Sequence, residues 1–280
     1  MNLTSPSQVK SWCIENDFHP NKVLGQNFLI DQNALKAIVD AGLEGLEGLG
    51  GLGGLEVLEI GPGLGVLTEE MLKRGCRVTA IEKDPVLAAR LKGSLGNPEG
   101  LTVVAADALA WLARGDQAHK VSQTSQTSQT FSCMVSNLPY QAGTRILLEL
   151  VKARELKSMT VLVQTEVAER LAAGPGSKTR GLAGVWAQLD YDVRIVRKVA
   201  ASCFWPRPEI GSSVVRLDRH DRNLALSEEE RKLFHRLTKQ AFEHRRKQLG
   251  SIFKDLIQST ARAEELSNDD WTALVKGLIG

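Results

Sequence analysis

Short apolar segments alternate with amphipathic ones between residues 56 and 164, and this alternation limits the possible folds more than any other feature of the chain. Strands are predicted over residues 56–60, 77–81, 101–105, 131–136 and 158–164. Helices are predicted between them, over residues 67–73, 85–91 and 145–154. This order is typical of βαβ units, in which helices cover both faces of a mostly parallel sheet.

The last third of the chain departs from this alternation. Residues 191–199 and 212–217 are strand-like and are separated by a Pro-rich loop, which predicts an antiparallel hairpin at one edge of the sheet. From Ser227 the pattern is helical, since Ser227 and Glu230 form a capping-box pair before an apolar stripe. We therefore expect a Rossmann-like α/β domain with a mostly parallel, seven-stranded sheet over residues 1–220. A small helical domain is expected over residues 221–280.

Two segments have unusual compositions. Residues 42–55 alternate Gly and Leu, and residues 122–130 repeat the triplet Ser-Gln-Thr. Neither shows a pattern that could bury a face, so both are predicted to be flexible insertions. Each precedes a strand and should lie at the amino-end edge of the sheet, opposite the edge where ligands bind in such folds.

Composition excludes several classes of protein. Lys and Arg number 35 against 33 Asp and Glu, so global charge does not indicate a nucleic-acid partner. No apolar run approaches the ~18 residues of a membrane-spanning helix, and the first residues do not resemble a secretory signal. The four cysteines, which show no metal-ligand spacing, are expected to be reduced, buried thiols: Cys13, Cys76, Cys133 and Cys203.

A glycine-rich turn follows the first of the alternating strands. Residues 61–65 read Gly-Pro-Gly-Leu-Gly and run into a predicted helix, whose free N–H groups suit an anionic ligand. An ordinary turn is the alternative, but Glu82 ends the next strand 21 residues after Gly61, where a carboxylate can accept hydrogen bonds from ribose hydroxyls. Val66 stands where the dinucleotide fingerprint needs its third small residue. These features favour an adenosyl ligand that bears a carboxylate over a pyrophosphate.

Asp107 follows the third strand. Taken alone, it is most simply a helix N-cap. The carboxyl ends of neighbouring parallel strands meet in one crevice, however, so Asp107 should lie near Gly61 and Glu82. There its carboxylate could accept a hydrogen bond from an adenine amino group.

The tetrapeptide Asn137-Leu138-Pro139-Tyr140 follows the fourth strand. Such a sequence is often only a turn. At this edge of the sheet, however, the Asn137 side-chain oxygen and the Leu138 carbonyl could accept both N–H bonds of an exocyclic purine amine. They would aim its lone pair at an electrophilic methyl group and stabilise the positive charge that develops on nitrogen. Tyr140 could stack on the base, and this chemistry needs neither a metal nor a cysteine nucleophile.

The glycine turn, Glu82, Asp107 and the tetrapeptide at 137–140 follow one another along the chain. In this order they resemble the motifs of S-adenosylmethionine-dependent adenine N-methyltransferases. Residues 24–29 (Leu-Gly-Gln-Asn-Phe-Leu), the run Phe204-Trp205-Pro206-Arg207-Pro208 and the later Ser213-Val214-Val215 narrow the resemblance. They are similar to the ribosomal RNA adenine dimethyltransferases, specifically those of the small-subunit (16S) type. The resemblance covers about residues 20–255 and includes six motifs in order.

The resemblance implies a cytoplasmic, monomeric enzyme that uses S-adenosylmethionine and no metal. Its substrate would be two adjacent adenosines in the hairpin loop near the 3′ end of 16S rRNA, methylated on the small ribosomal subunit, with a role in subunit biogenesis. The residues implied to bind the cofactor are Gln26, Asn27, Leu29, Gly61, Gly63, Glu82, Asp107 and Asn137. Phe204 is implied to stack on the target adenine opposite Tyr140, whereas from the residues alone it would be a core aromatic.

Positive charge is concentrated near the start of the helical region. Between Arg231 and Lys254 there are eight Lys or Arg residues against one acid, Glu243. A solvated helix face is the plain alternative, but so few acids favour contact with RNA phosphates. The predicted RNA-binding residues are Arg207, Lys239, Arg245, Arg246 and Lys247.

Four other functions remain open at this point. The first is methylation of one adenine of large-subunit rRNA, and the second is DNA adenine methylation, although the helical region is small for a DNA-recognition domain. A non-catalytic RNA-binding assembly factor is a third. A NAD-dependent oxidoreductase is the weakest, given Val66 and the lack of a hydride-relay pattern.

Overall fold

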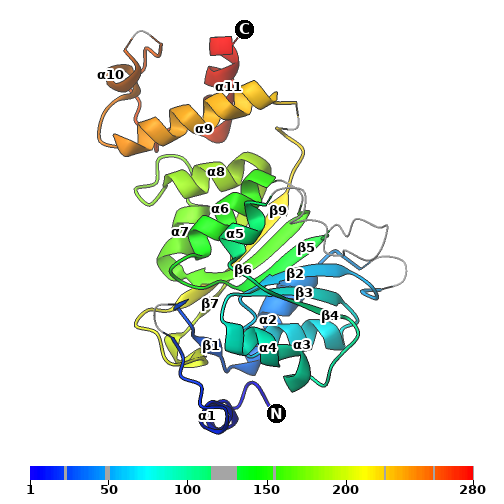
Figure 1. The fold of residues 1–280 in the computed structure, drawn as a ribbon. Helices are drawn as coiled ribbons and strands as arrows, with labels where there is room; N and C mark the ends of the chain where they lie inside the picture. Colours follow the sequence, from blue (N-terminus) through cyan, green and yellow to red (C-terminus); the bar gives the residue numbers. More distant parts are fainter. Residues whose placement is uncertain are drawn as a thin grey trace.

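A seven-stranded sheet forms the centre of the computed structural model, with helices on both faces (Figure 1). The structure describes residues 1–21, 24–47, 51–114, 131–153, 156–223, 225–254 and 256–279. The strands of this sheet are β2 (Glu56–Ile60), β3 (Arg77–Glu82), β4 (Leu101–Ala105), β5 (Cys133–Asn137), β6 (Ser158–Gln164), β7 (Tyr191–Val199) and β9 (Ser212–Arg219). Their spatial order is β4-β3-β2-β5-β6-β9-β7.

The pairing of the strands fixes where a ligand can bind. Strands β4, β3, β2, β5 and β6 pair in parallel, and β9 pairs antiparallel with both β6 and β7. The predicted mostly parallel sheet and its antiparallel edge hairpin are thus confirmed. Chain order reverses between β2 and β5, and in open α/β sheets ligands bind in the crevice at the carboxyl ends of such strands.

Helices divide into two groups by the face of the sheet that they cover. One face packs against α2 (Gln32–Leu43), α3 (Val66–Lys73) and α4 (Pro85–Ser94). The other packs against α5 (Ala108–Leu112), α6 (Gly143–Ala153), α7 (Thr165–Ala172) and α8 (Leu182–Asp190). Because apolar side chains from both faces of the strands are buried, β2 and β5 are held rigidly beneath the crevice.

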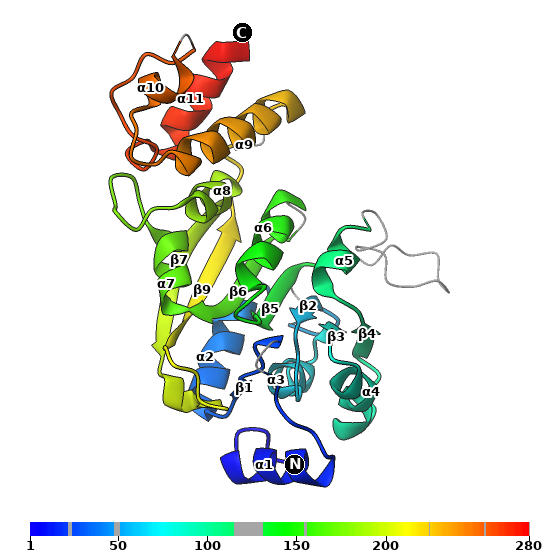
Figure 2. The same cartoon turned by 60° about the vertical axis from the view of Figure 1, so that its left-hand side comes forward.

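An N-terminal unit lies at the carboxyl-end edge of the sheet, at the bottom of Figures 1 and 2. It consists of α1 (Pro6–Glu15) and the short strand β1 (Phe28–Leu29), which pairs antiparallel with β8 (Phe204–Trp205). Side chains of this unit pack against the glycine turn and α4 in a small apolar cluster that includes Phe28, Leu64 and Leu87. The chain before α2 therefore reaches the ligand crevice.

Three helices follow the sheet: α9 (Glu228–Glu243), α10 (Leu249–Phe253) and α11 (Asn268–Ile279). The capping box predicted at Ser227 and Glu230 is present at the start of α9. Figure 1 shows these helices beyond α8, at the end of the molecule away from α1. They share an apolar cluster with Val185 and Leu189 of α8, so they pack against the α/β part of the chain.

The interpretation of residues 42–55 needs correction. Gly42 and Leu43 belong to α2 and are buried, so the segment begins inside a core helix. The side chains of Leu46, Leu52 and Leu55 pack against the same core cluster as α2. Glycine at position 42 fits because a Cβ there would lie 2.5 Å from a methyl group of Val135. The other predicted insertion, residues 122–130, lies outside the described residues.

Candidate active site

The glycine turn after β2 forms one wall of the crevice. Gly63 adopts a φ of 59° and Gly65 a φ of 90°, which L side chains rarely adopt. A Cβ on Gly63 would lie 3.1 Å from the Phe28 ring, and one on Gly65 would lie 2.6 Å from Leu91. The turn is thus packed tightly against Phe28 and Leu91, and its residues line the crevice at the start of α3.

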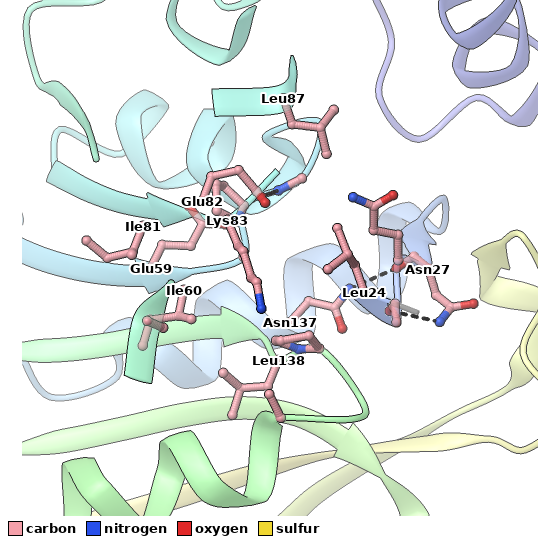
Figure 3. Close-up of a pocket in the computed structure, with 18 of the residues that line it drawn as sticks. Leu24, Asn27, Glu59, Ile60, Ile81, Glu82, Lys83, Leu87, Asn137 and Leu138 are labelled. Carbon is pink, nitrogen blue, oxygen red and sulfur yellow. Dashed lines mark hydrogen bonds between the residues drawn. The ribbon is translucent and has the colours of Figure 1, made fainter. Parts of the chain in front are cut away.

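Glu82 stands at the end of β3 beside this turn. Its carboxylate accepts hydrogen bonds from the backbone N–H of Gly63 (3.0 Å) and of Asp84 (2.8 Å), as Figure 3 shows for the first. Burial raises the pKa of Glu82, although the two backbone donors act in the opposite direction. The carboxyl group is therefore fixed at the pocket wall with its oxygens in place to accept from hydroxyl groups.

Asp107 follows β4 and has three partners. Its Oδ1 accepts from the N–H groups of Leu109 (2.9 Å) and Ala110 (3.2 Å), so Asp107 is the N-cap of α5. Its Oδ2 lies 2.8 Å from the Lys83 ammonium nitrogen. The hydrogen bond from Lys83, followed by the one from Ala110, holds the pKa of Asp107 below its usual value. The N-cap interpretation is correct, and it leaves Oδ2 outside the cap, paired with another residue of the pocket lining.

Residues 24–29 cross the pocket as a strap. Gln26 donates from Nε2 to Oδ2 of Asp84 (2.9 Å), and Asn27 donates from Nδ2 to the carbonyl of Gly25 (3.1 Å). Gly25 packs closely on the tetrapeptide after β5, since a Cβ on it would lie 3.1 Å from the Tyr140 nitrogen. Gln26, Asn27 and Leu29 all line the pocket.

The Asn137 amide faces the same space from the end of β5. Its Nδ2 donates to the main-chain oxygen of Asn27 at 3.1 Å (Figure 3). The Leu138 side chain is buried, and the backbone N–H of Gly143 donates to the Pro139 carbonyl at 2.7 Å, which fixes the turn. Tyr140 is half-buried, and its hydroxyl lies 2.6 Å from Oγ of Ser212.

Together these elements enclose a cavity of about 310 Å³. The structure brings the following predicted residues to its lining: Gln26, Asn27, Leu29, Gly61, Gly63, Glu82, Asp107, Asn137, Leu138, Pro139 and Tyr140. A cavity of this size with a few convergent polar groups is typical of a small-molecule site. Carboxylate acceptors at Glu82 and Asp107 with a glycine-shaped turn between strands suit the hydroxyls, amine and carboxylate of an adenosyl amino acid.

Phe204 requires a correction, because the structure does not bring it into this pocket. Its side chain is 2% exposed in the core cluster beneath α2, where β8 pairs with β1. The core-aromatic alternative describes this position. The next residue, Trp205, stacks on Phe28 with 6.4 Å between ring centroids.

Two charged lining residues were missed by sequence analysis. Glu59 is 1% exposed at the floor of the pocket and accepts a hydrogen bond from Oγ1 of Thr68 at 2.6 Å. Burial raises its pKa to about 8. A carboxylate between the apolar residues Leu58 and Ile60, just before the glycine turn, was the available signal. Lys83, the other missed residue, gave no such signal because lysine is common at the end of a strand.

The predicted RNA-binding residues lie in two places. Arg207 is exposed just after β8, near the N-terminal unit. Lys239, Arg246 and Lys247 are exposed on or after α9, whereas Arg245 is half-buried, 3.5 Å from Glu264, and donates to the Lys178 carbonyl.

Arg231, counted in the same basic run, is buried. It forms an ion pair with Asp190 at 2.8 Å and therefore does not belong to the basic surface.

The prediction of reduced, buried cysteines is confirmed at three of the four positions. Cys13, Cys76 and Cys133 are buried free thiols, whereas Cys203 is only half-buried.

Among the described residues, no group of three or more His, Cys, Asp or Glu side chains could hold a metal ion. In the same part of the chain, no helix is long and apolar enough to cross a membrane.

This sheet order and this crevice define the Rossmann-like class of S-adenosylmethionine-dependent methyltransferases. The family model described as ribosomal RNA adenine dimethylase matches residues 17–274. The chain belongs to the ribosomal RNA adenine dimethylase family, and S-adenosylmethionine is its methyl donor.

The two curated relatives described next share the same protein name. The chain is 42% identical over 220 residues to "Ribosomal RNA small subunit methyltransferase A" of Deinococcus radiodurans, covering 77% of this chain and 67% of that protein. It is 36% identical over 248 residues to the protein of the same name from Alkaliphilus oremlandii, covering 88% and 82%.

Solved structures share the fold. A dimethyladenosine transferase from Plasmodium falciparum superposes with a TM-score of 0.68 at 21% identity, over 88% of this chain and 95% of that one. The 23S rRNA methyltransferase ErmE gives 0.64 at 23% identity, over 91% and 100%.

Proposed function

We propose that this protein dimethylates the N6 amines of two adjacent adenosines in the 3′-terminal hairpin loop of small-subunit (16S) rRNA. Two relatives named as small-subunit methyltransferases, at 42% and 36% identity, support small-subunit rRNA over large-subunit rRNA as the substrate. In this proposal the enzyme acts as a cytoplasmic monomer during small-subunit biogenesis.

One observation supports the chemistry most directly, namely the orientation of the Asn137 amide. A carbonyl oxygen can only accept a hydrogen bond, so the contact with the Asn27 carbonyl assigns Nδ2 to that side. Oδ1 is thereby left as an acceptor for an N–H of the target amine. An amine held by this oxygen presents its lone pair to a methyl group rather than conjugating it fully with the ring.

Bound S-adenosylmethionine supplies an electrophilic methyl group on a sulfonium centre. In the proposed step the adenine nitrogen forms a bond to that carbon while the carbon–sulfur bond breaks and its electron pair stays on sulfur. The nitrogen becomes positively charged, and Asn137 Oδ1 stabilises that charge before a proton is lost to water. Glu82 would hold the ribose hydroxyls and Asp107 the adenine amine of the cofactor.

The helical region is proposed to contact RNA phosphates through Lys239, Arg246 and Lys247, with Arg207 acting near the pocket. In Figure 1, β1, which pairs with the strand just before Arg207, lies far along the molecule from α9, so the RNA would extend along it. Phosphate contacts position RNA without reading its sequence. Selection of the two adenosines is then left to the pocket and to the shape of the loop.

The decisive experiment is radiolabelled methyl transfer from S-adenosylmethionine. Undermethylated small subunits, large-subunit RNA and duplex DNA are offered side by side, and labelled nucleosides are identified by digestion and chromatography. Dimethyladenosine from small subunits alone is the expected result. Label in large-subunit RNA or DNA would assign another substrate, and ribosome binding without any label would indicate an assembly factor.

A further inference from the structure

Lys83 lines the pocket beside Asp107, the carboxylate proposed to accept from the adenine amine of the cofactor. Its side chain extends from the end of β3 into the cavity in Figure 3. The ammonium lies 2.8 Å from Oδ2 of Asp107, and the two side chains are 59% and 37% exposed. Since Oδ1 caps α5, Oδ2 is the oxygen of this carboxylate that a ligand in the pocket could use.

We propose that Lys83 competes with the cofactor's adenine amine for Oδ2 of Asp107 and thereby sets cofactor affinity. This inference rests on the proposed role of Asp107. An amine that takes the position of the ammonium on Oδ2 displaces it, so in this scheme the ion pair lowers the affinity for any ligand that carries adenine. Lys83 is a specificity-determining residue in this scheme and takes no part in methyl transfer.

The expected size of the effect follows from the exposure of the pair. Exposed ion pairs contribute about two- to fivefold to an equilibrium constant, and salt weakens them. Removing the ammonium should therefore tighten adenine-containing ligands by about two- to fivefold. Helix α5 should be unaffected, because its cap uses the other oxygen.

Calorimetric binding of adenosine, S-adenosylhomocysteine and S-adenosylmethionine tests this inference in the full-length protein. The variants are Lys83→Met and Lys83→Ala, with Lys73→Met as the control, because Lys73 forms an exposed pair with Glu69 on α3 at 3.0 Å. Both Lys83 variants should bind all three ligands more tightly by a similar factor. Adenosine affinity of the unchanged protein should rise with salt, whereas that of Lys83→Ala should not.

Several results would overturn the inference. Tighter binding of S-adenosylmethionine alone would indicate simple repulsion of its positive charge, and tighter binding by Lys83→Met alone would indicate a new apolar contact. Unchanged or weaker binding of adenosine would also contradict it.

Asp107→Asn distinguishes failure of the proposed adenine site from failure of the proposed competition by Lys83. If this variant, made together with Lys83→Ala, leaves adenosine affinity equal to that of Lys83→Ala alone, the proposed adenine site fails. If it weakens binding while the Lys83 variants bind as before, only the competition fails.

Discussion

Nδ2 of Asn137 lies 3.1 Å from the main-chain oxygen of Asn27, and this contact determines which way the amide faces. The two residues are 110 positions apart in the chain, on β5 and on the N-terminal strap. The strap is held in turn by Gln26, whose side chain donates to Asp84 at the start of α4. The oxygen proposed to hold the target amine is therefore positioned by backbone that belongs to another part of the fold.

Asn137→Ala should abolish most methyl transfer while leaving the cofactor site largely intact. Removing one donor or acceptor that stabilises developing charge costs about 10²–10³ in kcat. Cofactor affinity should fall by less than about tenfold, because the substitution removes at most one hydrogen bond to the cofactor. Single-turnover methyl transfer and calorimetric binding of S-adenosylhomocysteine measure the two quantities.

Asn137→Asp serves as the matched variant, because it keeps an oxygen toward the amine but turns a second oxygen toward the Asn27 carbonyl. It should also lose activity. Wild-type turnover by either variant would contradict the orienting role of the amide.

Arg246→Gln combined with Lys247→Gln should weaken RNA binding and reduce its salt dependence. Each phosphate that is no longer neutralised reduces the slope of log affinity against log salt by about 0.7–0.9, so two such phosphates predict a decrease of about 1.5. Fluorescence anisotropy with a labelled rRNA fragment, between about 50 and about 200 mM salt, gives the slope. Lys92→Gln, an exposed lysine of α4, is the control. An unchanged slope would exclude these two side chains from the RNA surface.

The crevice could be predicted from sequence because its parts follow a regular pattern. Gly61, Glu82, Asp107 and Asn137 each end or follow a parallel strand, and such ends meet at one edge of a sheet. Strand and helix positions were readable from the apolar alternation, so the placement of these groups needed no tertiary information.

The features that the sequence could not reveal depend on contacts between residues that are far apart in the chain. The pairing of β1 with β8 buries Phe204, although its motif suggests a base-stacking role. A basic run likewise does not show that Arg231 points inward to Asp190. The strap contact between Asn27 and Asn137 has no local signal at all.

Glu59→Gln should stabilise the protein at alkaline pH. The pKa of Glu59 is about 8 in the folded protein against an ordinary value of 4.5, so the folded state keeps a proton that the unfolded chain loses. This group's contribution to stability therefore falls as pH rises from about 4.5 to 8 and stays low above that range. The variant should gain on the order of 3–5 kcal/mol at pH 9 and little at pH 5.

Urea unfolding of the wild type and the variant at both pH values measures this gain. Glu99→Gln, an exposed carboxyl, is the control and should leave the pH dependence as it is. If Glu59→Gln follows the wild-type pH dependence, then Glu59 ionises normally in the folded protein.

Arg231→Met should destabilise the protein strongly, because it leaves a buried carboxylate without its partner. Nη1 of Arg231 lies 3.0 and 2.8 Å from the two oxygens of Asp190, and the side chains are only 6% and 9% exposed. Removing one member of a buried pair costs about 3–5 kcal/mol. Lys232→Met, at the exposed neighbouring position, should change stability by no more than about 0.5 kcal/mol. Urea unfolding compares these variants with Arg231→Met/Asp190→Asn, which should recover part of the stability. Equal stability of Arg231→Met and Lys232→Met would mean that the Asp190 pair does not join α8 to α9.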